Sequence, residues 1–317
     1  MTYAFDAELA PWVPTIPALD YHDLPTTRAI LAHISASQPA DTSGVHVGTH
    51  RVAGTVGQPD TVVRVYRPVT TQGNRAAALL YLHWGGYVTG NLDTVHATAL
   101  RLSCELDAVV VNVDYRLAPE HRFPAALLDC YAALLWVREY APDLGVDPNR
   151  IGVAGESAGG GLAAALTLLA RDRGGPPIGF QSLVYPQLDD GLDTVSARQF
   201  VDTPKWDRST AQLSWHYYLG PSLDGDVSPY AAPARADDLS NLPPAFVSVC
   251  EFDPLRDEGL IYAHRLIQAG VPTELHHYPG TFHGSLSITD AAITRRMLND
   301  QTESLRRAMR TTIGELR

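Results

Sequence analysis

The chain has 317 residues, of which 45% are hydrophobic and 19% are charged. These are ordinary values for a globular protein, and they exclude a wholly disordered or fibrous chain. The formal net charge of −11 argues against nucleic acid as a partner, because nucleic-acid binders concentrate basic residues on one face. A neutral or weakly charged small molecule is the better expectation.

Two further classes of protein are disfavoured. Cys104, Cys130 and Cys250 lie far apart and have no CxxC spacing, so we expect neither a disulfide framework nor a metal site. The first 20 residues have no basic start and no long apolar run, and no stretch of 18 apolar residues occurs anywhere. We therefore expect a cytoplasmic protein without a membrane span.

In chain order, residues 1 to about 44 come first and combine helical patterns with prolines. Short runs of apolar and β-branched residues then recur, which is typical of buried strands. The eight runs cover residues 45–53, 61–67, 77–83, 108–113, 150–155, 180–185, 245–250 and 273–278. Helical patterns cover residues 93–105, 124–140, 158–172 and 256–269.

Alternation of strands and helices from residue 77 onward predicts an α/β fold with an eight-stranded, mostly parallel sheet flanked by helices. The first two strands have no helix between them, so we expect an antiparallel start. An aromatic-rich segment from 187 to about 220 interrupts the alternation. Because long connections inside a domain are often functional, we interpret it and residues 1–44 as one helical cap on a single domain, 1–317. Ordinary helix packing is the alternative role for its aromatic residues.

The segment Gly155-Glu-Ser157-Ala-Gly159 runs from a predicted strand into an Ala- and Leu-rich helix. A serine at such a sharp turn exposes its hydroxyl, and the two glycines let neighbouring chain approach closely. The helix directs free N–H groups at developing negative charge. The pattern predicts Ser157 as a nucleophile. A glycine-rich packing turn or a phosphate-binding loop is the alternative, although neither GxGxxG nor the Walker spacing is met.

A glycine pair follows the strand at 77–83, in the segment Trp84-Gly85-Gly86-Tyr87. Backbone amides of such a loop can hold the oxyanion of a tetrahedral intermediate together with the amide of Ala158, the residue after the nucleophile. A simple tight turn is the alternative.

The candidate acid and base also follow strands. Among 12 histidines, only His283 combines a strand-end position with nearby glycine on both sides. Asp253 follows the strand at 245–250, although it also suits a helix N-cap before Pro254. Asp257 is a rival acid about one turn inside the helix. The order Ser157, Asp253, His283 matches that of α/β-hydrolases.

Five motifs in this order resemble those of the hormone-sensitive-lipase-like esterases, also called bacterial esterase family IV. They are HWGGY at 83–87 against the family's HGGG[FY], DYRLAPEHRFPAALLD at 114–129, GESAGG at 155–160 against G[DE]SAGG, DPLRDEG at 253–259, and FHG at 282–284. The resemblance covers nearly the whole chain.

This resemblance implies an α/β-hydrolase fold and hydrolysis of carboxylic esters, usually with short or medium acyl chains. It implies Ser157 as nucleophile, His283 as base and Asp253 as the acid that orients it. It also implies an oxyanion hole under the cap, formed by Gly85, Gly86 and Ala158. The mechanism passes through an acyl-enzyme and requires no metal or organic cofactor.

One departure from the family pattern is Trp84, which replaces the first glycine of the motif. Tryptophan takes a positive φ less readily than glycine, and we hypothesise that Trp84 restricts the substrate site. Tyr87, Tyr185 and Trp206 are further candidates for the substrate pocket.

Other functions stay open on the same residues. Amide deacetylation, lactone opening or carbamate cleavage could use the same triad, and a non-catalytic small-molecule receptor is an alternative from another class. A purely structural role has no positive feature in the sequence. The physiological substrate, the enantiopreference and the oligomeric state, including a homodimer, are not defined by the sequence.

Overall fold

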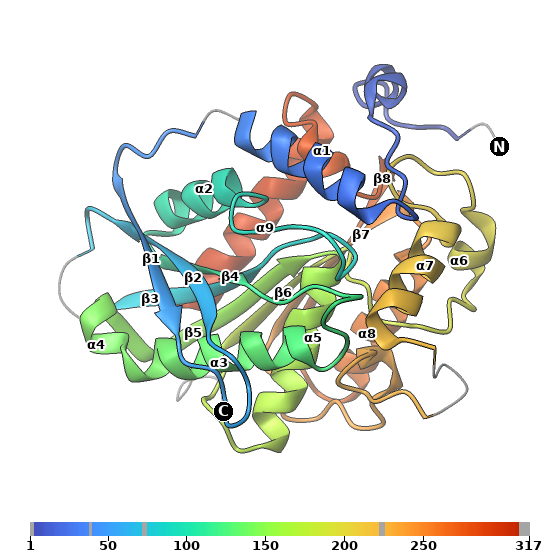
Figure 1. The fold of residues 1–317 in the computed structure, drawn as a ribbon. Helices are drawn as coiled ribbons and strands as arrows, with labels where there is room; N and C mark the ends of the chain where they lie inside the picture. Colours follow the sequence, from blue (N-terminus) through green and yellow to red (C-terminus); the bar gives the residue numbers. More distant parts are fainter. Residues whose placement is uncertain (1–2, 38–39, 72–74, 222–225, 311–317) are drawn as a thin grey trace.

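The computed structural model describes residues 3–37, 40–71, 75–221 and 226–310. Its centre is an eight-stranded sheet in the order β1-β2-β4-β3-β5-β6-β7-β8 (Figure 1). The strands are β1 (Val45–Val52), β2 (Thr61–Pro68), β3 (Ala76–Leu82), β4 (Val109–Asp114), β5 (Val146–Glu156), β6 (Phe180–Val184), β7 (Ala245–Phe252) and β8 (Thr273–Phe282). Strand β2 is antiparallel to β1 and β4, and every other pair is parallel. All eight predicted strands and the antiparallel start are confirmed.

The four predicted helices are also present, as α2 (His96–Leu106), α3 (Ala125–Glu139), α5 (Ala158–Asp172) and α8 (Arg256–Gln268). The remaining helices are η1 (Ala10–Thr15), α1 (Leu24–Ser37), α4 (Ala141–Leu144), α6 (Val195–Gln199), α7 (Arg208–Leu219), η2 (Pro233–Arg235), η3 (Ser285–Ser287) and α9 (Ala292–Arg310). Helix α9 was not expected, because it is highly charged and buries only a narrow stripe that includes Met297, Leu305 and Met309.

Helices cover both faces of the sheet, with α2 and α9 on one face and α3, α5 and α8 on the other (Figure 1). Strand β3 shows why both faces are apolar. Ala78, Leu80 and Leu82 join the core under α3 and α5, whereas Ala77, Leu79 and Tyr81 join the core under α2 and α9. Successive side chains of a strand point to opposite faces, so a continuous apolar run builds two cores.

Two other segments pack near the carboxyl ends of the parallel strands. On α1, Arg28 donates to the backbone carbonyls of Val88 at 2.8 Å and Ala118 at 2.9 Å, and it forms an ion pair with Glu120. The segment between β6 and β7 carries α6 and α7. The proposed cap range 1–44 includes residues 1–2 and 38–39, which lie outside the described residues.

Acidic side chains of α8 hold the β6–β7 segment in place. The Asp257 carboxylate accepts a hydrogen bond from the Ser196 amide at 2.7 Å, and the buried Glu258 accepts one from the Leu188 amide at 2.6 Å. None of the helices in the described ranges is long and apolar enough to cross a membrane.

Candidate active site

Ser157 lies at the sharp turn between β5 and α5, with φ 55° and ψ −121°. This backbone conformation is unusual for any residue other than glycine. It is stabilised by main-chain hydrogen bonds, because the Ser157 amide donates to Val184 O at 2.9 Å and the Gln187 amide donates to Ser157 O at 3.0 Å. The predicted strand-turn-helix setting of the serine is therefore present.

Three side chains from the ends of β5, β7 and β8 meet at this turn. His283 Nε2 lies 2.9 Å from Ser157 Oγ, and His283 Nδ1 lies 2.7 Å from Asp253 Oδ2. Asp253 is fully buried. A carboxylate can only accept, so Nδ1 must carry the proton donated to Asp253, which leaves Nε2 free to accept from the serine hydroxyl.

The contacts of Asp253 and Asp257 show which of the two acids lies beside His283. Helix α8 begins at Arg256, so Asp253 is not its N-cap, and its Oδ1 instead accepts from the Leu255 amide at 2.9 Å. The rival acid Asp257 contacts Ser196 and the Arg256 guanidinium. Within the described residues, the carboxylate hydrogen-bonded to His283 is that of Asp253.

The segment before His283 differs from the expectation. Strand β8 does not end near Tyr278 but continues to Phe282 through a bulge opposite Cys250 and Phe252, with Gly280 at φ 75°. The extra residues of the bulge let the strand keep pairing with β7 beyond Pro279. A tight turn follows His283 at Gly284, whose φ is 71°.

The loop after β3 carries the candidate oxyanion donors. Gly85 and Gly86 have φ values of 132° and 60°. Among the described residues, no acceptor takes a hydrogen bond from the amides of Gly85, Gly86 or Ala158. Free amides are what an oxyanion requires, so Gly85, Gly86 and Ala158 stay the candidate donors.

Neighbouring side chains fix the backbone of this loop. The Tyr115 hydroxyl donates to His83 O at 2.8 Å, and the Ser214 hydroxyl donates to Gly86 O at 2.7 Å. The Ala118 amide donates to Tyr87 O at 2.9 Å. The motif at 114–129 therefore supports the glycine loop from one side and α7 supports it from the other.

Trp84 and Tyr87 lie on the same loop but have different surroundings. Trp84 has no positive φ, so the replacement of the family's glycine causes no backbone strain here. Its half-buried indole packs against the core under α2 and α9. Tyr87 is 1% exposed, stacks on Tyr218 at a ring distance of 4.0 Å, and donates to Gln187 O. Substrate contact by either side chain stays a prediction.

Tyr185 and Trp206 contact the imidazole directly. The Tyr185 ring meets His283 edge to face at 4.8 Å, and the Trp206 ring stacks on it at 5.6 Å. Trp206 is 3% exposed and lies so close to Gly86 that a Cβ there would be 2.6 Å from its ring. Both residues adjoin the candidate triad, and their contact with substrate stays a prediction.

Glu156 is a neighbour of the site that sequence reasoning missed. It accepts hydrogen bonds from the hydroxyls of Tyr81 at 2.5 Å and Tyr185 at 2.6 Å. Burial, with the adjacent carboxylate, raises the pKa of both phenols well above their usual value, so both remain donors. The available signal was an acid beside the nucleophile in a buried strand, where charge needs partners.

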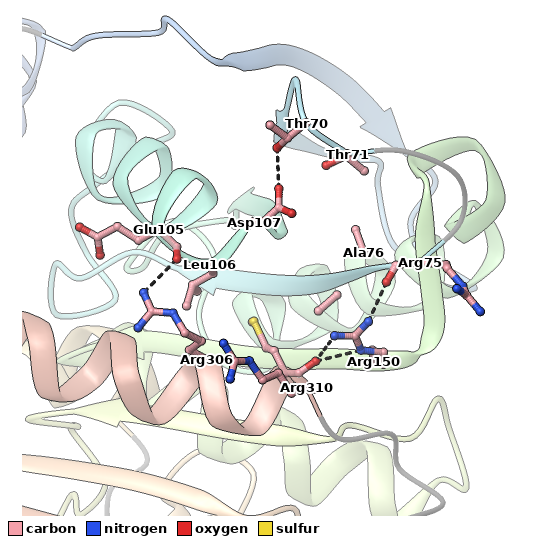
Figure 2. A pocket seen from close by; sticks show the side chains of 12 residues that line it. Thr70, Thr71, Arg75, Ala76, Glu105, Leu106, Asp107, Arg150, Arg306 and Arg310 are labelled. Atoms are coloured by element: carbon pink, nitrogen blue, oxygen red, sulfur yellow. Dashed lines mark hydrogen bonds between the residues drawn. The ribbon is translucent and has the colours of Figure 1, made fainter.

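A separate pocket of about 540 Å³ lies near the start of β3, β4 and β5 (Figure 2). Arg150 donates there to the carbonyls of Arg75 and Met309, and Arg306 donates to the carbonyl of Glu105. Arg150 therefore holds the end of α9 to β5, and Arg306 holds it to α2, at the edge of the sheet opposite Ser157. Within the described ranges, no group of three or more His, Cys, Asp or Glu side chains could hold a metal ion.

A model of the alpha/beta hydrolase fold family matches residues 79–287. The chain belongs to this family, and the resemblance to the hormone-sensitive-lipase-like esterases is confirmed. Carboxylesterase NlhH of Mycobacterium tuberculosis is 46% identical over 240 residues, which are 74% of each chain. Esterase LipI of the same species is 44% identical over 223 residues, which are 70% of this chain and 69% of LipI.

Solved structures agree with these sequence matches. The structure of a bacterial heroin esterase superposes with a TM-score of 0.93 at 46% identity, covering 97% of this chain and 99% of the esterase. Esterase LipW from Mycobacterium marinum superposes with a TM-score of 0.88 at 38% identity, covering 97% of each chain.

Proposed function

We propose that the chain hydrolyses carboxylic esters of short to medium acyl chains through a Ser157–His283–Asp253 triad. The observation that carries this proposal is the line of hydrogen bonds from the buried Asp253 through His283 to the Ser157 hydroxyl. Ester hydrolysis is also the activity named for the similar carboxylesterase and esterases.

In the first step, His283 takes the Ser157 proton while the serine oxygen attacks the ester carbonyl. Asp253 keeps the imidazole in the reactive tautomer and stabilises its charged form. The imidazolium then protonates the departing alcohol, leaving an acyl-enzyme. Water activated by the same imidazole attacks the acyl group and releases the carboxylic acid and the free serine.

Negative charge develops on the carbonyl oxygen in both steps. The free amides of Gly85, Gly86 and Ala158 would bind this oxygen, and each such donor contributes on the order of 3 kcal/mol to the transition state. The proposed mechanism uses only groups of the protein and water, and it requires no metal or organic cofactor.

We also propose that α1 and the 187–220 segment act as a cap. Ser157 and His283 are only 3% and 6% exposed. Trp206 covers His283, and Tyr21, just before α1, packs edge to face on Trp206 at 5.5 Å. Substrate entry therefore requires these aromatic side chains to move, and the space they leave would limit the acyl chain.

The test replaces Ser157 with alanine and measures turnover of p-nitrophenyl esters from acetyl to dodecanoyl. We expect kcat to fall on the order of 10⁶-fold, because the nucleophile acts as a unit with its base. The wild type should prefer the shorter half of the series. A folded Ser157→Ala protein with near-native kcat would contradict the mechanism.

The same assay separates the alternatives on this scaffold. Matched anilides and lactones report amide or lactone cleavage, and tight binding without turnover would identify a receptor. Location in the cytoplasm is a further proposal that rests on the sequence, whereas assembly as a homodimer is a proposal that the sequence does not define.

A further inference from the structure

Lys205, in the 187–220 segment, contacts the turn that follows the candidate base. Its ammonium group donates to the carbonyl of Gly284 at 2.9 Å and to the hydroxyl of Ser287 at 2.5 Å. The Ser287 hydroxyl in turn donates to Gly284 O at 3.1 Å. Gly284 follows His283 directly in the chain, so the ammonium holds the carbonyl of the next peptide, between Gly284 and Ser285, in the turn that follows the imidazole.

Lys205 is also the only lysine in the sequence, and the other 23 of the 24 basic Lys and Arg residues are arginines. An ammonium is a compact charge with three donors, whereas a guanidinium is a planar fork. The contact with Gly284 is close, because a Cβ added there would be 3.2 Å from Lys205 Cδ. The small ammonium group and unbranched methylene chain of lysine fit the limited space beside Gly284.

The backbone of Lys205 is held in an unfavourable conformation. Its φ is 64°, in the left-handed region that residues other than glycine and asparagine rarely adopt. The next residue is Trp206, whose ring stacks on His283 and whose carbonyl accepts from the Thr203 hydroxyl at 2.7 Å. Trp206 therefore contacts the ring face of His283, and Lys205 contacts the turn that begins one residue after it.

We propose that Lys205 is a positioning residue for ester hydrolysis, which holds the Gly284–Ser287 turn and through it the orientation of His283 toward Ser157. This inference deepens the proposed function and rests on it. It explains why the two donors of one ammonium are directed at the turn rather than at an acidic side chain.

The ammonium is partly desolvated in this position. Burial lowers the pKa of Lys205 to about 8, and the attraction of the Glu156 carboxylate opposes that shift. Hydrogen bonds donated by a charged, partly desolvated group are stronger than those between neutral groups. The contact can therefore restrain the turn even though Lys205 as a residue is exposed.

The test compares Lys205→Met and Lys205→Arg with the wild type on p-nitrophenyl butyrate. We expect Lys205→Met to lower kcat roughly 10-fold, the loss of about one hydrogen bond from a charged donor, with KM unchanged within about 2-fold. Lys205→Arg should recover part of the rate. Arg198→Met is the matched control, because it removes an exposed cation from the same segment, and it should leave kcat unchanged.

Reductive dimethylation of the folded wild type gives a second measurement if Lys205→Met fails to fold. It keeps the charge but removes two of the three N–H donors, and Lys205 is the only side chain in the protein that it modifies. We expect kcat to fall several-fold in the wild type and not in Lys205→Arg.

An unchanged kcat in folded Lys205→Met, or in fully dimethylated wild type, would overturn the role of Lys205 while leaving the proposed function intact. A loss of kcat equal to that of Arg198→Met would overturn it as well. If the wild type hydrolyses no ester, both the proposed function and this inference fail.

Discussion

At the scale of single residues, the motif DPLRDEG shows how three acids close in sequence take different tasks. Asp253 contacts His283, whereas Asp257 and Glu258 accept from backbone amides of Ser196 and Leu188 in the 187–220 segment. Residues 253–258 therefore contact both the candidate base and the 187–220 segment that packs on it. Sequence alone could not assign these partners, because both lie at least 30 residues away from the acid they contact.

Replacing Asp253 with asparagine should lower kcat on the order of 10⁴-fold, because an amide no longer selects the tautomer in which Nε2 accepts. Stopped-flow or steady-state assays with p-nitrophenyl butyrate would measure the change. Asp257→Asn is the matched control and should cost less than about 10-fold. Equal losses in the two variants would show that the acid at 253 has no special part in the reaction.

His83, in the motif HWGGY, is buried against Tyr115 and lies outside the candidate triad. Its ring stacks on Tyr115 at 4.0 Å, and its Nδ1 lies 2.8 Å from Trp84 O. Its Nε2 is buried without a protein partner among the described residues. Burial therefore disfavours the imidazolium and lowers the pKa of His83 from 6.5 to about 4.

This shift predicts a loss of stability in mild acid. Between pH 6.5 and pH 4 the unfolded chain binds a proton at His83 that the folded chain rejects, so the free energy of unfolding falls as the pH falls. We expect His83 to account for about 2 kcal/mol of loss from pH 7 to pH 5. Urea titrations of wild type and His83→Gln at both pH values would measure it. A pH dependence identical in the two proteins would contradict the burial argument.

At the scale of elements, the turn between β5 and α5 depends on close backbone approach. A Cβ on Gly155 would lie 2.3 Å from the backbone of Gly159, whereas a Cβ on Gly152 would meet only ordinary contacts of 3.4 Å or more. Both glycines lie on β5, so they differ in packing and not in secondary structure.

Gly155→Ala should therefore destabilise the fold by about 3 kcal/mol, the upper range for an overpacked site. Gly152→Ala, as the control, should cost less than about 1 kcal/mol. Chemical denaturation would give both values. If the two alanines cost the same, the turn is not limited by the space at Gly155.

Strands and helices of the sheet were the most predictable elements. Buried parallel strands are continuous apolar runs, as β3 shows with alanine, leucine and tyrosine and β4 shows with four valines. Helix α9 and the end of β8 were not predictable in this way. The first hides a narrow apolar stripe among charges, and the second passes through Pro279 and Gly280, which normally end a strand.

The candidate site was predictable where backbone geometry restricts the residue type. Ser157, Gly85 and Gly86 lie at turns whose φ values are positive, and such turns leave a sequence pattern. Glu156 and Lys205 left none that identified their partners, because their contacts come from distant segments: Tyr185 in one case and the turn after His283 in the other.

At the scale of the whole molecule, the parallel sheet brings the ends of β5, β7 and β8 to one edge, and the remaining segments enclose that edge. The side chains of the candidate triad are almost completely buried, and the Trp206 ring stacks on His283. Burial strengthens the hydrogen bonds of the triad by excluding water. The proposed cap would make access to Ser157 depend on movement of the covering segments, so that reactivity and opening are coupled.

The most direct test of the central claim is covalent labelling with a fluorophosphonate, followed by peptide mass mapping. We predict one label per chain, on Ser157, and a labelling rate that falls about 100-fold or more in His283→Ala, since a general base contributes at least that factor. Absence of a label on Ser157 in the wild type, or an undiminished rate without His283, would contradict the account.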